Sequence, residues 1–151
     1  MTQRAGPAAV ETTDALSRLL ADTYTLYLKT QNYHWNVTGP MFPALHTMFE
    51  EQYAELATAS DLIAERIRAL GHPAPGTFQE FAKLAAVGEE PGVPTAIEMV
   101  KNLARDHRIV VSTAREVADE AEQADDIATV DLATQRIELH EKIAWMLEAT
   151  L

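Results

Sequence analysis

Apolar residues recur along this chain at intervals of three and four positions, the spacing that places them on one face of an α-helix. The clearest case runs from residue 44 to residue 71, and strand-like alternation is absent from the sequence. We predict one long helix there, with a continuous apolar stripe that faces a protein core. That stripe consists of Leu45, Phe49, Leu56, Ile63, Ile67 and Leu70.

The same spacing predicts three further long helices and one short helix. The long ones cover residues 13–37, 96–122 and 127–150, and the short one covers 78–84 inside the long middle connection. Four long helices joined in this way predict an all-α fold, a four-helix bundle in which a crossover links the second and third long helices.

Residues that favour helix ends stand at the predicted boundaries. Thr12 is a candidate N-cap for the first helix and Asp125 or Asp126 for the last, because short polar side chains accept hydrogen bonds from free backbone N–H groups. We therefore expect residues 1–11 to form a flexible N-terminal tail and residues 12–151 to fold as a single domain.

Composition limits the chemistry that this chain can perform. It has 151 residues, 47% of them hydrophobic, and no cysteine, so disulfides, thiolate metal sites and thiol nucleophiles are excluded. The N-terminal segment lacks the apolar run of a signal peptide, and no stretch approaches the ~18 apolar residues that span a membrane. We expect a soluble, cytoplasmic protein without a membrane partner.

The formal net charge is −11. Binding to a nucleic-acid backbone depends on clustered Lys and Arg, and the 12 basic residues of this chain form no run. An acidic surface attracts cations instead, although solubility alone explains most acidic surfaces.

A second, polar arc lies beside the apolar stripe of the predicted helix over residues 44–71. Counted from His46 at ~100° per residue, Glu50 falls near ~40°, Asp61 near ~60° and Glu65 near ~100°. Imidazole and carboxylate groups together are suitable ligands for iron or zinc. Other positions of this arc are small, which suggests that another surface packs closely there; they are Ala54, Ala57 and Ala64.

The four candidate ligands are too far apart to converge on one ion from one helix. Glu50 and Asp61 are separated by eleven residues, or ~16 Å along the axis, whereas metal–ligand bonds are ~2 Å long. An identical helix lying antiparallel across a two-fold axis would bring His46 and Glu50 of one chain against Asp61 and Glu65 of the other. We therefore hypothesise two equal metal sites for each pair of chains.

His34 lies at the end of the first predicted helix, and the following turn brings it toward His46. No histidine of the chain follows a glutamate by three positions, so the Glu-x-x-His pairs of an intrasubunit di-iron bundle are absent. A lone histidine is more often structural than a ligand, and we expect His72, His107 and His140 to be structural or surface residues. Core packing is the favoured interpretation of Trp35 and Trp145.

The segment from His34 to Gly71 resembles the signature of the Dps family, the mini-ferritins named as DNA-binding proteins from starved cells. The helix pattern extends the resemblance over nearly the whole chain. The motif is carried by His34-Trp35-Asn36-Val37, Gly39-Pro40, Phe42, Leu45-His46, Phe49-Glu50-Glu51, Tyr53, Asp61, Ala64-Glu65-Arg66-Ile67 and Leu70-Gly71, with a further match at Glu141-Lys142 and Trp145.

The resemblance implies a ferritin-like bundle assembled into a hollow, tetrahedral dodecamer. It implies ferroxidase sites at two-fold interfaces, which oxidise Fe(II), commonly with hydrogen peroxide and otherwise with dioxygen, and a ferric mineral stored inside. The ligands would be His34, His46 and Glu50 from one chain and Asp61 and Glu65 from its neighbour. Many members of the family have aspartate where this chain has Glu50.

Two further implications of the resemblance concern residues outside that ligand set. The position of Trp35 lies near the site, where an indole could donate an electron. The region of Asp126 and Asp131 lines three-fold pores through which iron enters, although capping of a helix would also explain these two acids.

Two other functions are consistent with the sequence. The chain could be a DNA-compacting stress protein in which iron oxidation is secondary, but the N-terminal segment carries only Arg4, which disfavours binding of DNA by a basic tail. It could also be a helical scaffold in which the polar arc is only a wet groove.

Overall fold

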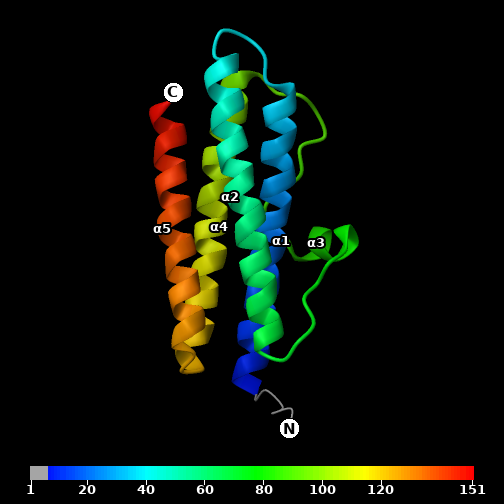
Figure 1. Cartoon of the computed structure of the whole chain (residues 1–151), viewed down its shortest axis with the longest axis vertical. Helices are drawn as coiled ribbons and strands as arrows, with labels where there is room; N and C mark the ends of the chain where they lie inside the picture. The colour runs from blue at the N-terminus through cyan, green and yellow to red at the C-terminus, as the bar shows by residue number, and fades with distance from the viewer. Residues whose placement is uncertain (1–6) are drawn as a thin grey trace.

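The computed structural model describes residues 7–151, and their side chains from Val10 onward. These residues form five helices and no strand (Figure 1). The helices are α1 (Pro7–Asn36), α2 (Phe42–Ala69), α3 (Phe78–Leu84), α4 (Ala96–Gln123) and α5 (Ile127–Ala149).

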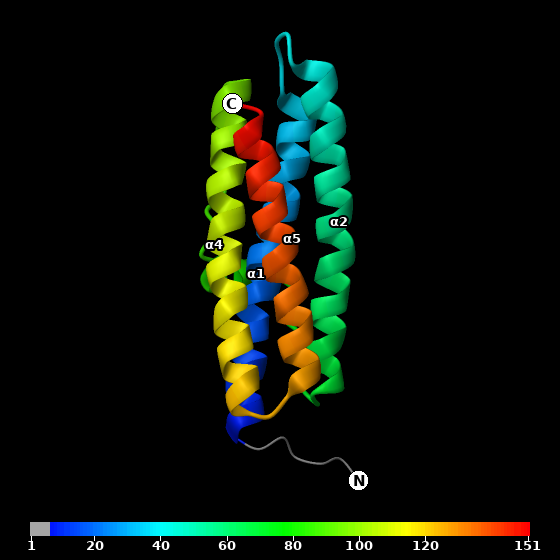
Figure 2. The same cartoon turned by 90° about the vertical axis from the view of Figure 1, so that its left-hand side faces the viewer.

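The four long helices lie side by side as two hairpins, α1 with α2 and α4 with α5 (Figures 1 and 2). Helix α1 also packs against α4, which joins the hairpins, and α3 lies outside the bundle against α1. The connection from α2 to α4 runs the length of the bundle and carries α3. The predicted all-α bundle with a short helix inside a crossover is therefore confirmed.

Short polar side chains set several of the helix boundaries. Thr77 accepts a hydrogen bond from the backbone N–H of Glu80 at the start of α3, and Asp126 accepts one from Thr129 at the start of α5. The prediction of Asp126 as a cap is confirmed. Thr95 and Glu98 form a capping box at the start of α4.

The start of the first helix was predicted wrongly. Helix α1 begins at Pro7, so Thr12 lies within it and is not its N-cap, and residues 7–11 are helical rather than tail. A proline at the first helical position is favourable because its missing N–H would have no helical partner there. The rest of the predicted tail, residues 1–6, lies outside the described residues.

The predicted apolar stripe of α2 forms part of the core. Its first five members are fully buried and Leu70 is partly buried. The expectation of core packing is wrong for Trp35 and Trp145, which are 60% and 62% exposed, and Ile97 is also exposed. All three face away from the bundle of a single chain, where they remain available to a neighbour.

Three buried polar side chains of α1 fix the connection between α3 and α4. The Asp22 carboxylate accepts hydrogen bonds from the backbone N–H groups of residues 86 and 87, and from the Thr113 hydroxyl. Lys29 donates to the carbonyl of Gly88 and forms an ion pair with Asp106. The Tyr33 hydroxyl donates to the Glu90 carboxylate at 3.0 Å. The crossover is therefore held at successive points along one helix.

Candidate metal site on the exposed face of α2

His34 and His46 form a stacked pair where α1 turns into α2. Their ring centroids are 3.8 Å apart and the ring planes differ by 12°. The α1–α2 turn brings the two residues together, as predicted. His34 is only 7% exposed and His46 is partly buried, so surrounding residues of the same chain restrict both side chains.

A reciprocal pair of hydrogen bonds fixes the tautomer of both neutral rings. His34 Nδ1 donates to the carbonyl of His46 at 2.6 Å, and His46 Nδ1 donates to the carbonyl of His34 at 2.8 Å. A carbonyl oxygen only accepts, so each neutral ring carries its proton on Nδ1 and keeps a lone pair on Nε2. This is the tautomer in which histidine ligates a metal through Nε2 while a backbone oxygen orients the ring.

Two aromatic rings complete the stack around the histidines. Phe42 lies on His46 with ring centroids 4.9 Å apart, and Tyr53 meets the edge of His34 at 5.2 Å. Reasoning from the sequence assigned neither ring to the site. The spacing of Tyr53 was a usable signal, because a residue seven positions after His46 lies on the same side of α2.

The three carboxylates of the predicted set stand free. Glu50, Asp61 and Glu65 are exposed, and no hydrogen bond or ion pair joins them to any other side chain described from Val10 onward. In the described part of one chain, no group of three or more His, Asp or Glu side chains is placed to hold a metal ion. A single chain therefore offers two imidazoles at one end of α2 and two separate carboxylates toward the other.

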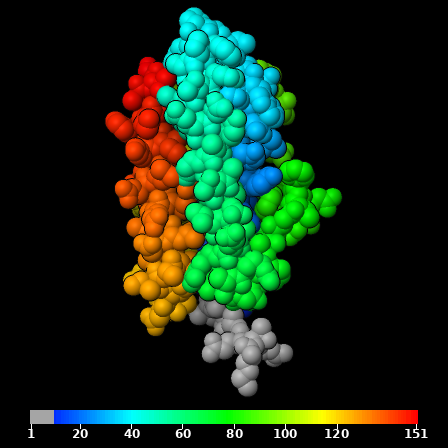
Figure 3. All heavy atoms as spheres, in the orientation of Figure 1, coloured from blue at the N-terminus to red at the C-terminus, as the bar shows by residue number. Residues whose placement is uncertain are grey.

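Asp61 and Glu65 border two different hollows beside α2. Asp61 lines a groove of about 600 Å³ toward α1 and α3, and Glu65 lines one of about 660 Å³ toward α5. Figure 3 shows α2 uncovered along this face of the molecule. Ala54 and Ala57 are exposed between the two ends, so a second helix could approach the backbone of α2 closely.

The two acids considered for a pore have partners within the chain. Asp126 receives hydrogen bonds from Thr129 and forms an ion pair with Arg66 at 2.8 Å. Burial alone would raise the pKa of Asp126, but these contacts outweigh burial and leave the pKa lowered. Asp131 accepts a hydrogen bond from Gln135. Capping and local pairing account for both side chains in one chain.

The remaining histidines lie away from this site. His107 and His140 are fully buried between α4 and α5, where their Nδ1 atoms are 2.8 Å apart. His72 is in the turn after α2. The interpretation of His107 and His140 as structural fits this placement, although the sequence did not reveal that they bind each other.

Several known proteins are similar to this chain in both sequence and fold. The family model for a ferritin-like domain matches residues 13–151. A DNA protection during starvation protein of Brevibacillus brevis is 38% identical over 136 residues, which cover 90% of this chain and 91% of the relative. The chain belongs to the ferritin-like Dps family.

Other relatives of this Dps chain extend the comparison. A low temperature-induced protein of Nostoc is 43% identical over 136 residues, covering 89% of this chain and 76% of the relative. The crystal structure of a Dps protein from Bacillus brevis matches with a TM-score of 0.94 at 35% identity, over 97% of this chain and 99% of that one.

A Dps protein from Vibrio cholerae, described as a member of a broad superfamily of ferritin-like diiron-carboxylate proteins, matches with a TM-score of 0.92. It is 29% identical, over 99% of this chain and 98% of that chain. Among the described helices of the present protein, none combines the length and the apolar character needed to cross a bilayer.

Proposed function

We propose that this Dps protein oxidises Fe(II) at sites shared by two antiparallel subunits, and stores the ferric product inside a hollow dodecamer in the cytoplasm. Hydrogen peroxide is the proposed oxidant, with dioxygen as the alternative. Membership of the ferritin-like Dps family supports an iron-related role in stress. Iron is here the substrate and the stored cargo.

The observation that carries this proposal is the pair of imidazoles with both Nε2 lone pairs free. Because each Nδ1–H binds a carbonyl, neither ring can turn its Nδ1 toward the metal or lose its orientation easily. His34 and His46 would bind Fe(II) through nitrogen. Asp61 and Glu65 of a neighbour would supply the negative charge that stabilises Fe(III), and Glu50 would complete the set.

The lack of a complete ligand set in one chain supports sharing between subunits. Among the described residues of one chain, no group of three or more His, Asp or Glu side chains is placed to hold a metal ion. Helix α2 leaves its candidate acidic ligands and the small residues Ala54 and Ala57 exposed. A two-fold contact is self-complementary, so one antiparallel pairing of α2 helices would complete two sites at once. A dodecamer closed by such contacts would enclose the mineral.

Stopped-flow oxidation of Fe(II) tests the reaction. We expect rapid oxidation by peroxide in the wild type and its loss in His46→Ala and in Asp61→Ala, whereas Asp119→Ala, an exposed acid of α4, should retain it. Unchanged rates in both site variants would contradict the proposal. Native mass spectrometry of the same samples reports whether the dodecamer has formed.

Mixing two inactive variants tests the sharing of sites directly. In a mixed pair of His46→Ala and Asp61→Ala chains, one site carries both substitutions and the other carries neither. Random reassembly should therefore restore about a quarter of the sites, because half the pairs are mixed and each has one intact site. A site contained in one chain would gain nothing from mixing.

Binding of DNA is the second candidate function, favoured by the name of the Brevibacillus relative. The net charge of −11 opposes it. We expect no gel shift at low salt without divalent cations. A strong shift under those conditions would make DNA compaction the better assignment.

A further inference from the structure

A continuous series of aromatic rings leads away from the candidate metal site through the subunit. From His34 it passes to Tyr53 at 5.2 Å, then to Tyr27 at 6.0 Å and to Tyr24 at 5.5 Å between ring centroids. Centroid separations of this size place neighbouring rings in van der Waals contact. We call Tyr53, Tyr27 and Tyr24 the tyrosine ladder.

The ladder is built mainly on one face of α1. Tyr24, Tyr27 and His34 are spaced at three and seven positions, and ten residues of helix extend ~15 Å along the axis. Tyr53 of α2 fills the gap between Tyr27 and His34. All three tyrosines are partly buried, so none is sealed from the solvent with which a phenol exchanges its proton during oxidation.

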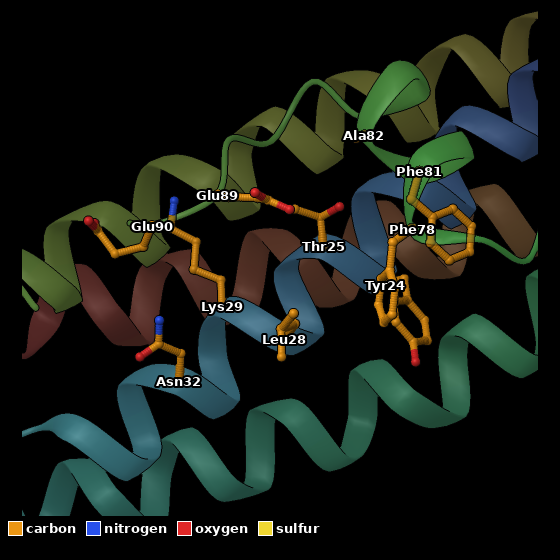
Figure 4. A pocket seen from close by; sticks show the side chains of 10 residues that line it. All are labelled: Tyr24, Thr25, Leu28, Lys29, Asn32, Phe78, Phe81, Ala82, Glu89 and Glu90. Atoms are coloured by element: carbon orange, nitrogen blue, oxygen red, sulfur yellow. The ribbon is translucent and has the colours of Figure 1, made fainter. Parts of the chain in front are cut away.

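Phenylalanines close the far end of the ladder. Tyr24 stacks on Phe81 at 5.1 Å and lies 6.4 Å from Phe78, and Figure 4 shows the three rings grouped between α1 and α3. A phenol is much easier to oxidise than a phenyl ring. A tyrosyl radical that forms at Tyr24 would therefore stay there, because it could not oxidise the phenylalanines of α3.

The two ends of the ladder correspond to two different metal sites. One end touches His34, and the other, Tyr24, lines the same groove of about 600 Å³ as Asp61. Under the proposed antiparallel pairing, His34 and Asp61 of one chain belong to different sites of the pair. The ladder thus runs through one subunit from one site to the other.

We propose that Tyr53, Tyr27 and Tyr24 carry electrons between the two iron sites of a subunit pair, an inference that rests on the proposed function. Peroxide needs two electrons and two protons to become two waters. One Fe(II) beside His34 supplies one electron and becomes Fe(III). A ladder phenol supplies the second electron and one proton, solvent supplies the other proton, and a tyrosyl radical remains.

The radical is then reduced from the opposite end. Fe(II) bound beside Asp61 gives one electron to Tyr24, which takes up a proton from solvent and becomes a phenol again. Two Fe(II) are thereby oxidised for each peroxide even when each site holds a single ion. Transfer in short steps between touching rings is favoured because electron tunnelling weakens exponentially with distance.

A metal-free experiment tests the ladder independently of iron chemistry. The chain has no cysteine, so Glu50→Cys provides one attachment point for a photo-oxidant, one helical turn from Tyr53. The background carries Trp35→Phe so that the exposed indole is not oxidised in place of Tyr53. A laser flash should then produce a tyrosyl radical, seen by transient absorption, and Tyr53→Phe should abolish it.

Tyr33→Phe is the matched control, because it removes a phenol from the same helix outside the ladder. Tyr33 contacts Phe49 and donates to Glu90, and among the described residues no ring contact joins it to a tyrosine of the ladder. We expect this control to leave the radical yield unchanged. Equal yields in Tyr53→Phe and the parent, or no radical in the parent, would overturn the ladder.

The inner steps are tested by replacing both Tyr24 and Tyr27 with phenylalanine. The radical should then be confined to Tyr53 and its lifetime should shorten. An unchanged lifetime would show that the radical never moves on from Tyr53, which also overturns the proposal. Thermal melting of each variant verifies that the bundle is intact.

The second part of the experiment uses one Fe(II) for every two sites and added peroxide, so that no second Fe(II) reduces the radical from the opposite end. Freeze-quenched electron paramagnetic resonance detects the product. We expect a tyrosyl signal that Tyr53→Phe abolishes and Tyr33→Phe retains; iron oxidation without any tyrosyl signal would contradict the ladder. If the wild type oxidises no iron, the proposed function fails, while the metal-free measurement still decides whether the tyrosines conduct.

Discussion

Two histidine pairs link neighbouring helices in this protein, and they differ in what their Nδ1 atoms bind. In the pair His34–His46, each Nδ1 donates to a backbone carbonyl and each Nε2 remains free. In the pair His107–His140, the two Nδ1 atoms bind each other inside the core. The same side chain can therefore present a lone pair to a ligand or consume it within the fold.

The protonation of the buried pair follows from Arg136. Its guanidinium only donates, and it lies 2.9 Å from His140 Nε2, so His140 carries its proton on Nδ1 and donates it to His107. The remaining proton of His107 is on Nε2, which is buried and finds no partner among the described residues. Arg136 also pairs with Glu55 of α2, so the network joins three helices.

Charge distinguishes the two pairs as clearly as geometry. Burial, with a further contribution from Arg136, lowers the pKa of His107 to about 3, and the pKa of His140 is also well below its ordinary value. A cation is excluded from this pair, because Arg136 already supplies a positive charge next to it. The exposed carboxylate of Glu50 lies one helical turn from His46 instead. Of the two pairs, only His34–His46, the outer pair, therefore suits a metal ion.

The largest expected effect comes from breaking the outer pair. His34→Ala should weaken the binding of Co(II) by about 100-fold or more, because even loss of a group that orients a ligand costs 10–100-fold. Isothermal titration calorimetry measures this directly. His107→Gln is the control: it should leave affinity for Co(II) intact, and a comparable loss in that variant would contradict the contrast between the pairs.

Breaking the inner pair, His107–His140, should act on stability rather than on metal binding. Arg136→Met removes the donor to His140 and leaves Glu55 unpaired. Removal of one partner of a fully buried ion pair costs about 3–5 kcal/mol, and the partial exposure of Glu55 reduces our expectation to about 2 kcal/mol. Denaturant unfolding at neutral pH gives the value, and an unchanged midpoint would show that the network is not stabilising.

Lowering the pH should also destabilise the fold through the inner pair. The folded state holds His107 and His140 neutral, whereas the unfolded chain protonates them below about pH 6.5, so the stabilising contribution is complete above that pH. For His107 it is lost as the pH falls from about 6.5 toward 3, at about 1.4 kcal/mol per pH unit, and the lowered pKa of His140 adds a loss of the same sign.

The measurement is the free energy of unfolding between about pH 7 and pH 5. His107→Leu combined with His140→Leu should flatten the pH dependence, because the variant lacks the two imidazoles that burial keeps neutral. The difference between the two proteins isolates the pair from the carboxylates, which titrate in both. Parallel curves would mean that the buried histidines contribute nothing to acid sensitivity.

The smallest expected effect concerns the ring that covers the outer pair. Phe42 stacks on His46 at 4.9 Å, and aromatic contacts of this kind contribute about 0.5–1.5 kcal/mol. Phe42→Leu should therefore lower affinity for Co(II) only a few-fold and leave oxidation of Fe(II) detectable. A loss as large as that in His34→Ala would give Phe42 a greater role than orienting the ring.

The contrast also shows where sequence reasoning reached its limit. His34 and His46 are separated by one tight turn between two helices with clear periodicity, so their approach was predictable. His107 and His140 are 33 positions apart on different helices, and their contact depends on the relative rotation of α4 and α5. The same limit hid the contacts of Asp22, Lys29 and Tyr33 with a connection some sixty residues later.

Surface and core could not be separated reliably for large aromatic residues. Trp35 and Trp145 look like core residues by hydrophobicity, yet both are exposed in the single chain. Hydrophobicity reports a preference for burial but does not state whether the covering surface belongs to the same chain or to another one. In α2, by contrast, five apolar residues at helical spacing together identified the buried face correctly.

The sequence by itself determined the helices, most of their ends, the core stripe of α2 and the arc of candidate ligands, because these depend on residues within one or two helical turns. The tertiary structure alone decided the tautomers of the histidines, the course of the ladder from His34 to Tyr24 and the burial of the second histidine pair. Those features depend on distances between separate helices, and only the packed bundle fixes such distances.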